Sequence, residues 1–401
     1  MRTSRAVIGV IIALATLTAC SSDDDGVEVR LLAGGGDQPD GTGADAALPF
    51  SIVRLTSDGD GTLWGVTGSD VLVEVDSEGT VRSTQLQLDS GAVQEIAAAP
   101  DGTVYVLLDQ AGQDDGEAVV LELVDGELQP AVGVPAGDSG GESGPETPDG
   151  EPASEAELGY VGDIAIDSEG RLLFTERVDP AGPDAGYLLR RVDGDGSLTT
   201  VAGQPNPDAD DDTTDDETAA AYFPDGTDTA ELLLFTQTAI AAGPGEQVVV
   251  QTPQSVYTID DGSATVVLGS PDGSVPPATE DGPFSESVGA LSVSYRPGVP
   301  LLTLAVNADG GILAGTGPID GWDENAYAWR VADGSDAAQA IADAAAGNEQ
   351  TAIPTLYVSP GGEASVAAVF GGPATWLDDD TIAVGASGED ADIIVLVDVP
   401  D

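Results

Sequence analysis

The sequence predicts an all-β fold: a six-bladed β-propeller of four-stranded antiparallel blades, with the last blade closed by the N-terminal strand of the mature chain. Three observations lead to this prediction. A ten-residue pattern recurs along the chain, further β-rich runs follow each copy, and each end of the chain leaves a strand without a partner. Several short strands in a unit that repeats about six times are typical of a propeller.

The recurring pattern consists of a strand, a tight turn with an acidic residue and glycine, and a second strand. Residues 163–172 (DIAIDSEGRL) match residues 303–312 (TLAVNADGGI) almost position for position. Further copies cover 95–104, 239–248 and 373–382, and 51–63 is interpreted as a sixth copy with extra residues in its turn. Asp-Gly and Glu-Gly turns between β-rich runs favour antiparallel hairpins.

The two ends of the chain predict how the ring closes. Each copy is followed by a further apolar run and usually by a fourth strand, but the sixth unit ends at 393–397 without an outermost strand. Residues 27–33 form a strand that precedes the first unit. Pairing between these two segments would complete the last blade. The alternative is an open sandwich, in which the two ends need not meet.

The first residues predict export. Arg2 and Arg5 precede an apolar run, 6–19, that is too short to span a membrane and has the length of a signal-peptide core. The residues 17–20 (LTAC) resemble the lipobox of bacterial lipoproteins, and this resemblance implies cleavage before Cys20 and acylation of Cys20. The alternative is a secreted protein whose cysteine lies near the cleavage site by chance.

These features divide the chain into three parts. Residues 1–19 are expected to be a lipoprotein signal peptide, 20–26 a lipidated tether, and 27–401 the propeller. Cys20 is the single cysteine, so no internal disulfide can form. We therefore expect a protein held on the cell membrane by its lipid and facing the extracytoplasmic side.

The charge balance excludes several classes of function. The chain has 72 acidic residues against 11 arginines, no histidine, and a formal net charge of −61. Nucleic-acid binding needs clustered basic residues, so no nucleic-acid partner is expected. The lack of histidine excludes Ser-His-Asp, Cys-His and histidine-zinc mechanisms. We interpret the acidity as adaptation to a salty setting, with recruitment of a cationic partner as the alternative.

One family resemblance refines the prediction. Residues 197–203 (SLTTVAG), followed by a linker rich in Gly, Asp and Pro, are similar to the end of an NHL-type repeat. Residues 32–50 and 163–175 have the same character. The resemblance implies an NHL-like propeller, and such propellers mostly act as binding platforms, with a minority of enzymes. A protein or glycan partner is therefore expected in addition to the membrane.

The candidate site lies where the inner strands begin, because the axial channel of a propeller is its usual ligand site. Glu95 and Asp163 occupy equivalent positions there, whereas Ala239, Thr303 and Pro373 stand in the other aligned copies. Gluconolactonase-like propellers hold a divalent ion with a few channel carboxylates. This resemblance implies a site for a divalent ion, such as calcium, at Glu95 and Asp163, with Glu176 as a third candidate. We expect no cofactor, because two acids among five aligned copies do not form a ring of metal ligands, and we interpret these carboxylates as hydrated residues of the blade edge.

Other signals are weaker. The acidic run 208–217 lacks the spacing of a calcium-binding loop, and 193–196 (DGDG) is interpreted as a hairpin turn. Trp322 is an exposed candidate for sugar stacking, while Trp64 and Trp376 are expected in the core. The segment 135–157 is expected to be disordered.

The sequence therefore predicts a binding or scaffolding lipoprotein with no catalytic residues. The alternative is a metal-dependent hydrolase or lyase of the lactonase kind that uses the channel carboxylates. A transporter's solute-binding lipoprotein would need two lobes with helices, and the sequence shows no long helical periodicity.

Overall fold

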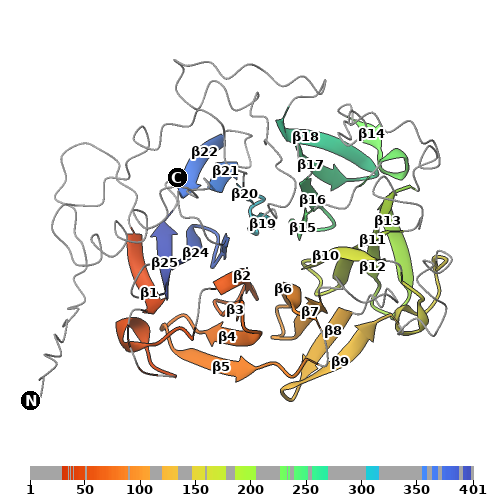
Figure 1. Ribbon diagram of the computed structural model, residues 1–401. Helices are drawn as coiled ribbons and strands as arrows, with labels where there is room; N and C mark the ends of the chain where they lie inside the picture. Colours follow the sequence, from red (N-terminus) through yellow and green to blue (C-terminus); the bar gives the residue numbers. More distant parts are fainter. Residues whose placement is uncertain are drawn as a thin grey trace, which may run out of the picture.

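The computed structural model describes part of the chain (Figure 1). The described residues are 29–34, 36, 38, 40–49, 52–88, 91–108, 120–133, 147–158, 160–177, 186–204, 226–232, 234, 239–251, 255–269, 304–315, 355–358, 364–368, 373–387 and 392–398. The expectations for the signal peptide, Cys20, the acidic run 208–217, Thr303 and Trp322 concern residues outside these ranges.

The described residues form six antiparallel sheets arranged around a central axis (Figure 1). Blade 1 contains β2 (Ile52–Ser57), β3 (Leu63–Thr67), β4 (Val71–Val75) and β5 (Val81–Gln85). Blade 2 contains β6 (Val93–Ala98), β7 (Val104–Leu108), β8 (Val120–Val124) and β9 (Glu127–Val132). Blade 3 contains β10 (Val161–Ile166), β11 (Leu172–Arg177), β12 (Tyr187–Val192) and β13 (Leu198–Gly203).

The second half of the chain repeats this arrangement. Blade 4 contains β15 (Ala239–Ala242), β16 (Val248–Gln251), β17 (Ser255–Asp260) and β18 (Ser263–Gly269), with β14 (Thr227–Asp228) as a fifth strand at its outer edge. Blade 5 contains β19 (Leu304–Val306), β20 (Ile312–Gly315), β21 (Thr355–Val358) and β22 (Ala364–Ala368). Blade 6 contains β23 (Ala374–Trp376), β24 (Thr381–Ser387), β25 (Asp392–Asp398) and β1 (Val29–Gly34). The prediction of an all-β propeller built from four-stranded antiparallel blades is confirmed.

The outer strand of blade 6 comes from the other end of the chain. β1 pairs antiparallel with β25, and the register places Leu31 opposite Val395 and Gly34 opposite Ile393. Gly34 has a φ of 101°, and a Cβ at this position would lie 2.3 Å from the carbonyl oxygen of Asp392. Only glycine therefore fits where β1 approaches β25 this closely.

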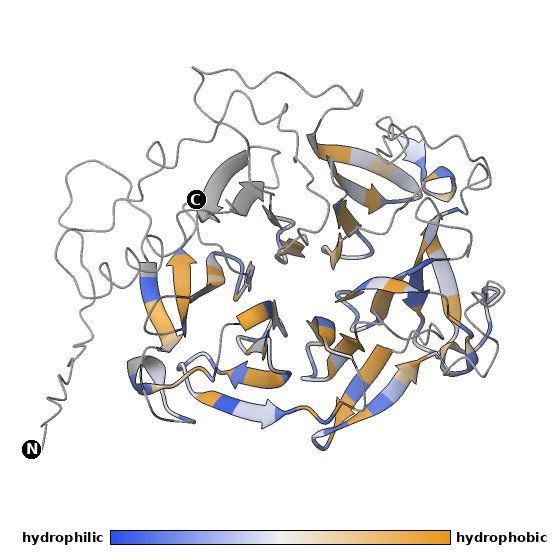
Figure 2. Ribbon diagram, in the orientation of Figure 1, coloured by the Kyte–Doolittle hydropathy of each residue, from blue (hydrophilic) through white to orange (hydrophobic). Residues whose placement is uncertain are grey.

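Apolar side chains fill the spaces between neighbouring blades. One core cluster combines Leu173 and Leu189 of blade 3 with Ile240 and Val250 of blade 4. Figure 2 shows the hydrophobic residues concentrated along the strands, with hydrophilic residues at the turns. Among the described residues, core clusters lie between blades 1 and 2, 2 and 3, 3 and 4, 5 and 6, and 6 and 1, so Val, Leu, Ile and Ala form a large core with few aromatic residues.

Within the described ranges, three short 3-10 helices lie in the connections that lead into blades 1, 3 and 4: η1 (Gly43–Asp45), η2 (Ala153–Glu155) and η3 (Thr229–Glu231). Each connection hydrogen-bonds to the outer hairpin of the blade that follows it. The backbone N–H of Gly43 donates to the carbonyl of Gly79 (2.8 Å). In the same way, Ala153 N–H donates to the carbonyl of Gly196 (2.8 Å), and Thr229 N–H donates to the carbonyl of Gly262 (3.1 Å). The residues that follow the helices, Ala46, Ala156 and Leu232, are buried between blades.

The prediction of disorder over 135–157 is wrong for its described part. Residues 147–158 are ordered because they pack on blade 3: Gly150 N–H donates to the carbonyl of Leu198 (2.8 Å), and the carboxylate of Asp149 accepts from Thr200 (2.9 Å). The composition of this segment is that of a linker, but its backbone hydrogen bonds are met by the outer edge of β13.

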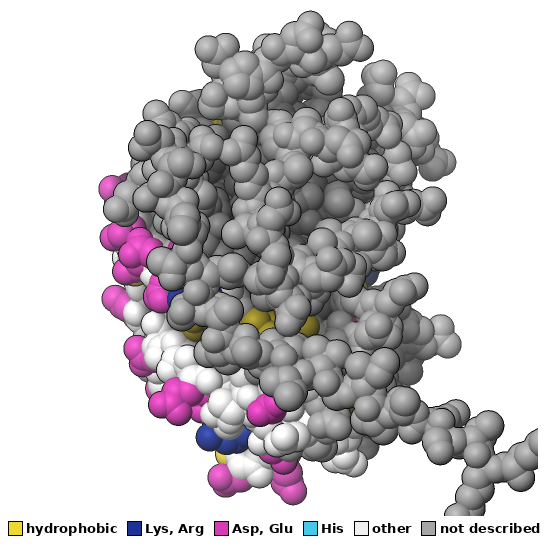
Figure 3. All heavy atoms as spheres, turned by 90° about the vertical axis from the view of Figure 1, so that its left-hand side faces the viewer, with side chains coloured by type: hydrophobic (Ala, Val, Ile, Leu, Met, Phe, Trp, Pro, Cys, Tyr) yellow, Lys and Arg dark blue, Asp and Glu magenta, His cyan; other side chains and the backbone are white. Residues whose placement is uncertain are grey.

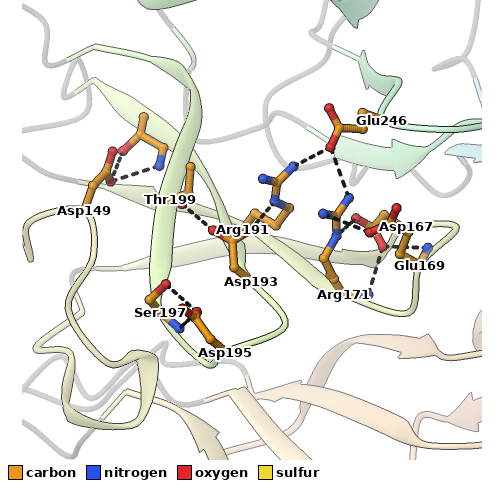
Figure 4. Close-up of polar contacts among 11 residues, drawn as sticks. Asp149, Asp167, Glu169, Arg171, Arg191, Asp193, Asp195, Ser197, Thr199 and Glu246 are labelled. Atoms are coloured by element: carbon orange, nitrogen blue, oxygen red, sulfur yellow. Dashed lines mark hydrogen bonds and ion pairs between the residues drawn. The ribbon is translucent and has the colours of Figure 1, made fainter.

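Figure 3 shows several acidic side chains and few basic ones on the described part of the face near β1. Some of the arginines join acids of a neighbouring blade. Arg171 and Arg191 of blade 3 each lie 3.7 Å from the carboxylate of Glu246 in blade 4 (Figure 4). Arg191 also donates to Asp193 (2.7 Å), in the turn that the sequence predicted as a hairpin.

The prediction that Trp376 lies in the core is supported, because this side chain is 5% exposed within a core cluster of blade 6. Trp64, which was also expected in the core, is half-buried and packs against the cluster between blades 1 and 2. Among the described residues, no helix has the length and apolar character needed to cross a membrane.

Candidate functional site

Three charged side chains lie near the start of the inner strands of blades 1, 2 and 3. Arg54 on β2, Glu95 on β6 and Asp163 on β10 each lie at or directly after a shift in the strand register. Such a bulge bends a strand and redirects the side chain next to it. The same local feature therefore turns one charged residue from each of three consecutive blades toward the central axis.

Arg54 is the residue that sequence reasoning missed. In each of these three blades, the charged residue precedes the first residue of the hairpin turn by four positions. That first turn residue is Asp58 in blade 1 and Asp167 in blade 3. The two turns have equal length, because Asp58 N–H donates to Thr62 and Asp167 N–H donates to Arg171. Residues 54–63 thus match 163–172 without a gap, and the expectation of extra turn residues in 51–63 is wrong. Alignment backward from the turn glycine would have revealed Arg54.

Arg54 joins blade 1 to blade 2. Its Nε donates to the backbone carbonyl of Gln94 (2.7 Å) and lies 2.9 Å from Oε2 of Glu95. Its Nη1 donates to the carbonyl of Val53 (2.8 Å). The side chains of Arg54 and Glu95 are only 18% and 25% exposed, so this ion pair is weakly screened by solvent.

Blade 2 is joined to blade 3, and blade 3 to blade 4, by similar contacts. Gln94 Nε2 donates to the carbonyl of Gly162 (2.8 Å). Asp163 accepts two backbone hydrogen bonds, from Ile164 N–H in its own blade (2.9 Å) and from Ile240 N–H in blade 4 (2.7 Å). The polar residues at this end of the channel therefore form a continuous chain of contacts across four blades, which we call the mouth belt (Arg54, Gln94, Glu95 and Asp163).

Both carboxyl groups of the mouth belt have perturbed pKa values. Burial raises the pKa of Glu95, although Arg54 and the N–H of Ile96 oppose the shift. Burial raises the pKa of Asp163 well above its usual value, and the charge of Glu95 raises it further. Asp163 is 9% exposed, so desolvation is a large cost for its ionised form. The two acids share one arginine, and they compete for the ionised state.

The mouth belt lies on the wall of a central cavity of about 520 Å³, a volume suited to a small organic ligand. Residues from the inner strands of all six blades line it. At the end where the inner strands begin, the charged residues of the described lining come from blades 1 to 3, whereas Ala239, Leu304 and Ala374 stand on the wall formed by blades 4 to 6. At the end where the hairpins turn, the lining includes Asp378 and Asp379.

Glu176 is not brought to this cavity. It lies on β11, is 1% exposed, and pairs with the fully buried Arg190, whose Nη1 is 3.3 Å from its Oε2. Arg190 Nη2 also donates to the carbonyl of Thr147 (2.8 Å) and lies 3.5 Å from Asp149. The pair therefore joins the strands of blade 3 to the connection 147–158, and no channel role follows from the position of Glu176.

The carboxylates do not fit a divalent ion. A calcium ion takes six to eight oxygen ligands, and these need lone pairs directed at the ion. Both oxygens of Asp163 already accept backbone N–H groups, and Glu95 is engaged by Arg54 and by Ile96 N–H. In the part of the chain that the structure describes, no group of three or more His, Cys, Asp or Glu residues could hold a metal.

The fold and site together define a class: a β-propeller whose central cavity has a charged belt at one mouth. No protein-family model matches the chain, and no curated protein matches its sequence. Among solved structures, it is similar to a gluconolactonase from Xanthomonas campestris, with 13% identity and a TM-score of 0.45 over 93% of this chain and 90% of that one.

Two further solved structures show comparable similarity. A streptogramin B lyase shares 10% identity, with a TM-score of 0.42 over 93% of this chain and 98% of that one. An auxiliary nutrient binding protein from Bacteroides thetaiotaomicron shares 10% identity, with a TM-score of 0.47 over 92% of this chain and 76% of that one. These scores are low, so the assignment of the fold rests on the sheet topology of the chain itself.

Proposed function

We propose that this chain is a lipid-anchored, extracytoplasmic β-propeller that binds a small ligand in its central cavity and leaves that ligand chemically unchanged. The observation that carries the proposal is the state of the mouth belt. Arg54, Glu95 and Asp163 face the cavity, yet each is engaged in hydrogen bonds that join neighbouring blades. Such groups give a cavity shape and charge, whereas catalysis needs a group free to exchange a proton or attack a substrate.

The finer architecture is part of the proposal: an NHL-like ring of six blades, closed where the N-terminal strand joins the last blade. The six sheets among the described residues and the pairing of β1 with β25 support the closed ring. The segment 197–203 supports the NHL-like character. A closed ring matters for function because it fixes the distance between opposite walls of the cavity.

The membrane anchor rests on the sequence alone. Residues 17–20 resemble a lipobox, and Cys20 is the single cysteine of the chain. Acylation there would place the propeller a few residues from the membrane surface, on the extracytoplasmic side. From that position it could present a captured ligand, or itself, to a protein or glycan partner.

The anchor is tested by metabolic labelling with a fatty acid and by partition into a nonionic detergent phase. We expect the wild-type chain to take up label and to enter the detergent phase, and Cys20→Ser to do neither. Ser21→Ala is the matched control and should behave as wild type. Unlabelled wild-type protein would contradict the anchor.

The cavity is tested with a variant that fills it. We expect Ala239→Trp to abolish thermal stabilisation by any compound that stabilises the wild type, because Ala239 lines the cavity. Ser83→Trp, on the exposed outer strand β5, is the control and should leave stabilisation intact. Ligands that stabilise both variants equally bind elsewhere, and that result would contradict the proposal.

One observation favours a second candidate, a hydrolase or lyase. A carboxyl group with a raised pKa beside a cavity can act as a general acid, and both Glu95 and Asp163 have this property. The test is turnover of a panel of lactones and sugar acids, followed by mass spectrometry. Product formation that Glu95→Gln abolishes would favour the enzyme over the binding protein.

A further inference from the structure

We infer that the central cavity binds an organic cation, meaning a substituted ammonium group carried on an apolar body. This inference rests on the proposed function, because it names the class of ligand that the cavity would take. It is carried by the charges on the cavity wall, by the contacts of Arg54, and by the apolar surface opposite the mouth belt.

The wall of the cavity has an excess of acids. Among the described residues, its charged lining consists of four acids and one arginine: Glu95, Asp163, Asp378, Asp379 and Arg54. Asp378 and Asp379 lie at the far end, so a ligand inside meets acids at both ends of the channel. In a cavity with walls of low dielectric, such an arrangement attracts cations and repels anions more strongly than the same charges in water.

Arg54 does not offset this excess for a ligand. Its Nε is held by the carbonyl of Gln94 and the carboxylate of Glu95, and its Nη1 by the carbonyl of Val53. An anion would therefore have to compete with contacts that join two blades. A cation meets no such competition, because it can approach Glu95, which is 25% exposed, without displacing Arg54.

A bound cation would also reduce the electrostatic cost of placing Glu95 close to Asp163. Glu95 is half-buried and Asp163 is buried, and the charge of Glu95 opposes the ionisation of Asp163. A positive charge placed near both acids favours their ionised forms and converts this repulsion into attraction. The site is therefore more complementary to a cation than to a neutral molecule of the same shape.

The remaining wall indicates that the cation is organic. The cavity of about 520 Å³ is far larger than a single hydrated ion requires, and Ala239, Leu304 and Ala374 line the side formed by blades 4 to 6. These side chains offer no ligands to a metal, but they bury hydrocarbon favourably. The described acids are likewise not grouped as a metal site.

The test is calorimetric titration with choline and with 3,3-dimethylbutan-1-ol, which has the same shape but a carbon in place of the charged nitrogen. The full chain is used in an uncharged detergent, at about 0.5 M salt, because salt screens non-specific attraction to the acidic surface. We expect choline to bind and the uncharged alcohol to bind about tenfold more weakly or not at all.

Two variants of opposite sign sharpen this test. Glu95→Gln should weaken choline binding about fivefold or more, whereas Arg54→Met should strengthen it, because the first removes a negative charge and the second a positive one. Glu127→Gln, an exposed acid on β9, makes the same change in net charge away from the cavity and should have no effect. Circular dichroism confirms that each variant is folded.

The outcomes separate the inference from the proposed function. Equal binding of choline and the alcohol, both lost in Ala239→Trp, would overturn the cation while leaving a ligand-binding cavity. Choline binding that Glu127→Gln weakens as much as Glu95→Gln would show a surface effect and overturn the inference. Failure of both compounds to bind at millimolar concentration would also overturn it, and failure of every compound in the Ala239→Trp screen would overturn the proposed function.

Discussion

Arg54→Met is the substitution that should reveal how strongly the mouth belt holds blades 1 and 2 together. Methionine keeps most of the apolar stem of arginine but removes the hydrogen bonds to Gln94 (2.7 Å) and Val53 (2.8 Å) and the ion pair with Glu95 (2.9 Å). Hydrogen bonds that involve a charged group contribute about 1.5–3 kcal/mol each, and partial exposure reduces the loss. We expect the free energy of unfolding to fall by about 2–4 kcal/mol.

The double variant shows how much of this loss belongs to the ion pair. Arg54→Met leaves Glu95 without the positive charge that lowers its pKa, so the half-buried carboxylate becomes more costly. Adding Glu95→Gln removes that cost, and the double variant should recover about 1–2 kcal/mol relative to the sum of the single variants.

Urea unfolding at constant salt, followed by tryptophan fluorescence, measures these differences. Arg82→Met is the matched control, because Arg82 lies even closer to its partner Glu74 (2.6 Å) but is 56% exposed. We expect this control to cost less than about 1 kcal/mol. Equal losses for Arg54→Met and Arg82→Met, or strict additivity in the double variant, would refute the view that the mouth belt couples the blades.

Three further predictions follow from the structure. The pKa of Asp163 is raised in the fold, so the stability that its protonated form contributes is present below the unfolded pKa and is lost as pH rises through the folded pKa. The free energy of unfolding of the wild type, relative to that of Asp163→Asn, should therefore increase from pH 8 toward pH 5, and a decrease on acidification would contradict the raised pKa. Leu31 and Val395 lie opposite one another in β1 and β25. The double variant Leu31→Cys with Val395→Cys, made in a Cys20→Ser background, should therefore form a disulfide and raise the urea midpoint of unfolding. Absence of the disulfide under oxidising conditions would mean that the two strands are not paired. The large excess of acids predicts a melting temperature that rises between low and molar salt, measured by calorimetry, and an unchanged temperature would count against adaptation to salt.

The repeated hairpin was the part of the fold most open to prediction from sequence. Its turn is short and local: Asp167 accepts from the backbone N–H groups of Glu169 and Arg171, and Gly170 takes a φ of 78° that other residues rarely adopt. Because these constraints act within five residues, the pattern of an acidic residue followed by glycine is sufficient to identify the turn.

The candidate site was predicted only in part, because its contacts link residues far apart in the chain. The equivalent positions of Glu95 and Asp163 in the repeated pattern identify both residues as candidates. The hydrogen bond that Asp163 accepts from Ile240 joins residues 77 positions apart, so no local sequence pattern predicts it. Glu176 pairs with Arg190 and does not line the cavity. Its pairing with Arg190 depends on the register of β11 and β12, in which Glu176 is opposite Leu188 and Arg190 is the diagonal neighbour.

The cavity itself could not be predicted, since its volume depends on how far apart opposite blades lie. No spacing within a blade encodes that distance. The anchor at Cys20, by contrast, is a sequence prediction that the described residues do not reach, and it remains one.

The most direct test of the account is to locate a ligand in the cavity. Crystals of the chain soaked with 4-bromophenyltrimethylammonium would report the ligand through the anomalous signal of bromine. We expect a single strong peak inside the cavity, with the ammonium group facing Glu95 and the ring against the wall that contains Ala239 and Leu304. A peak only on the outer surface, or none inside the cavity in crystals that diffract well, would contradict the claim that this propeller is a binding protein for small molecules.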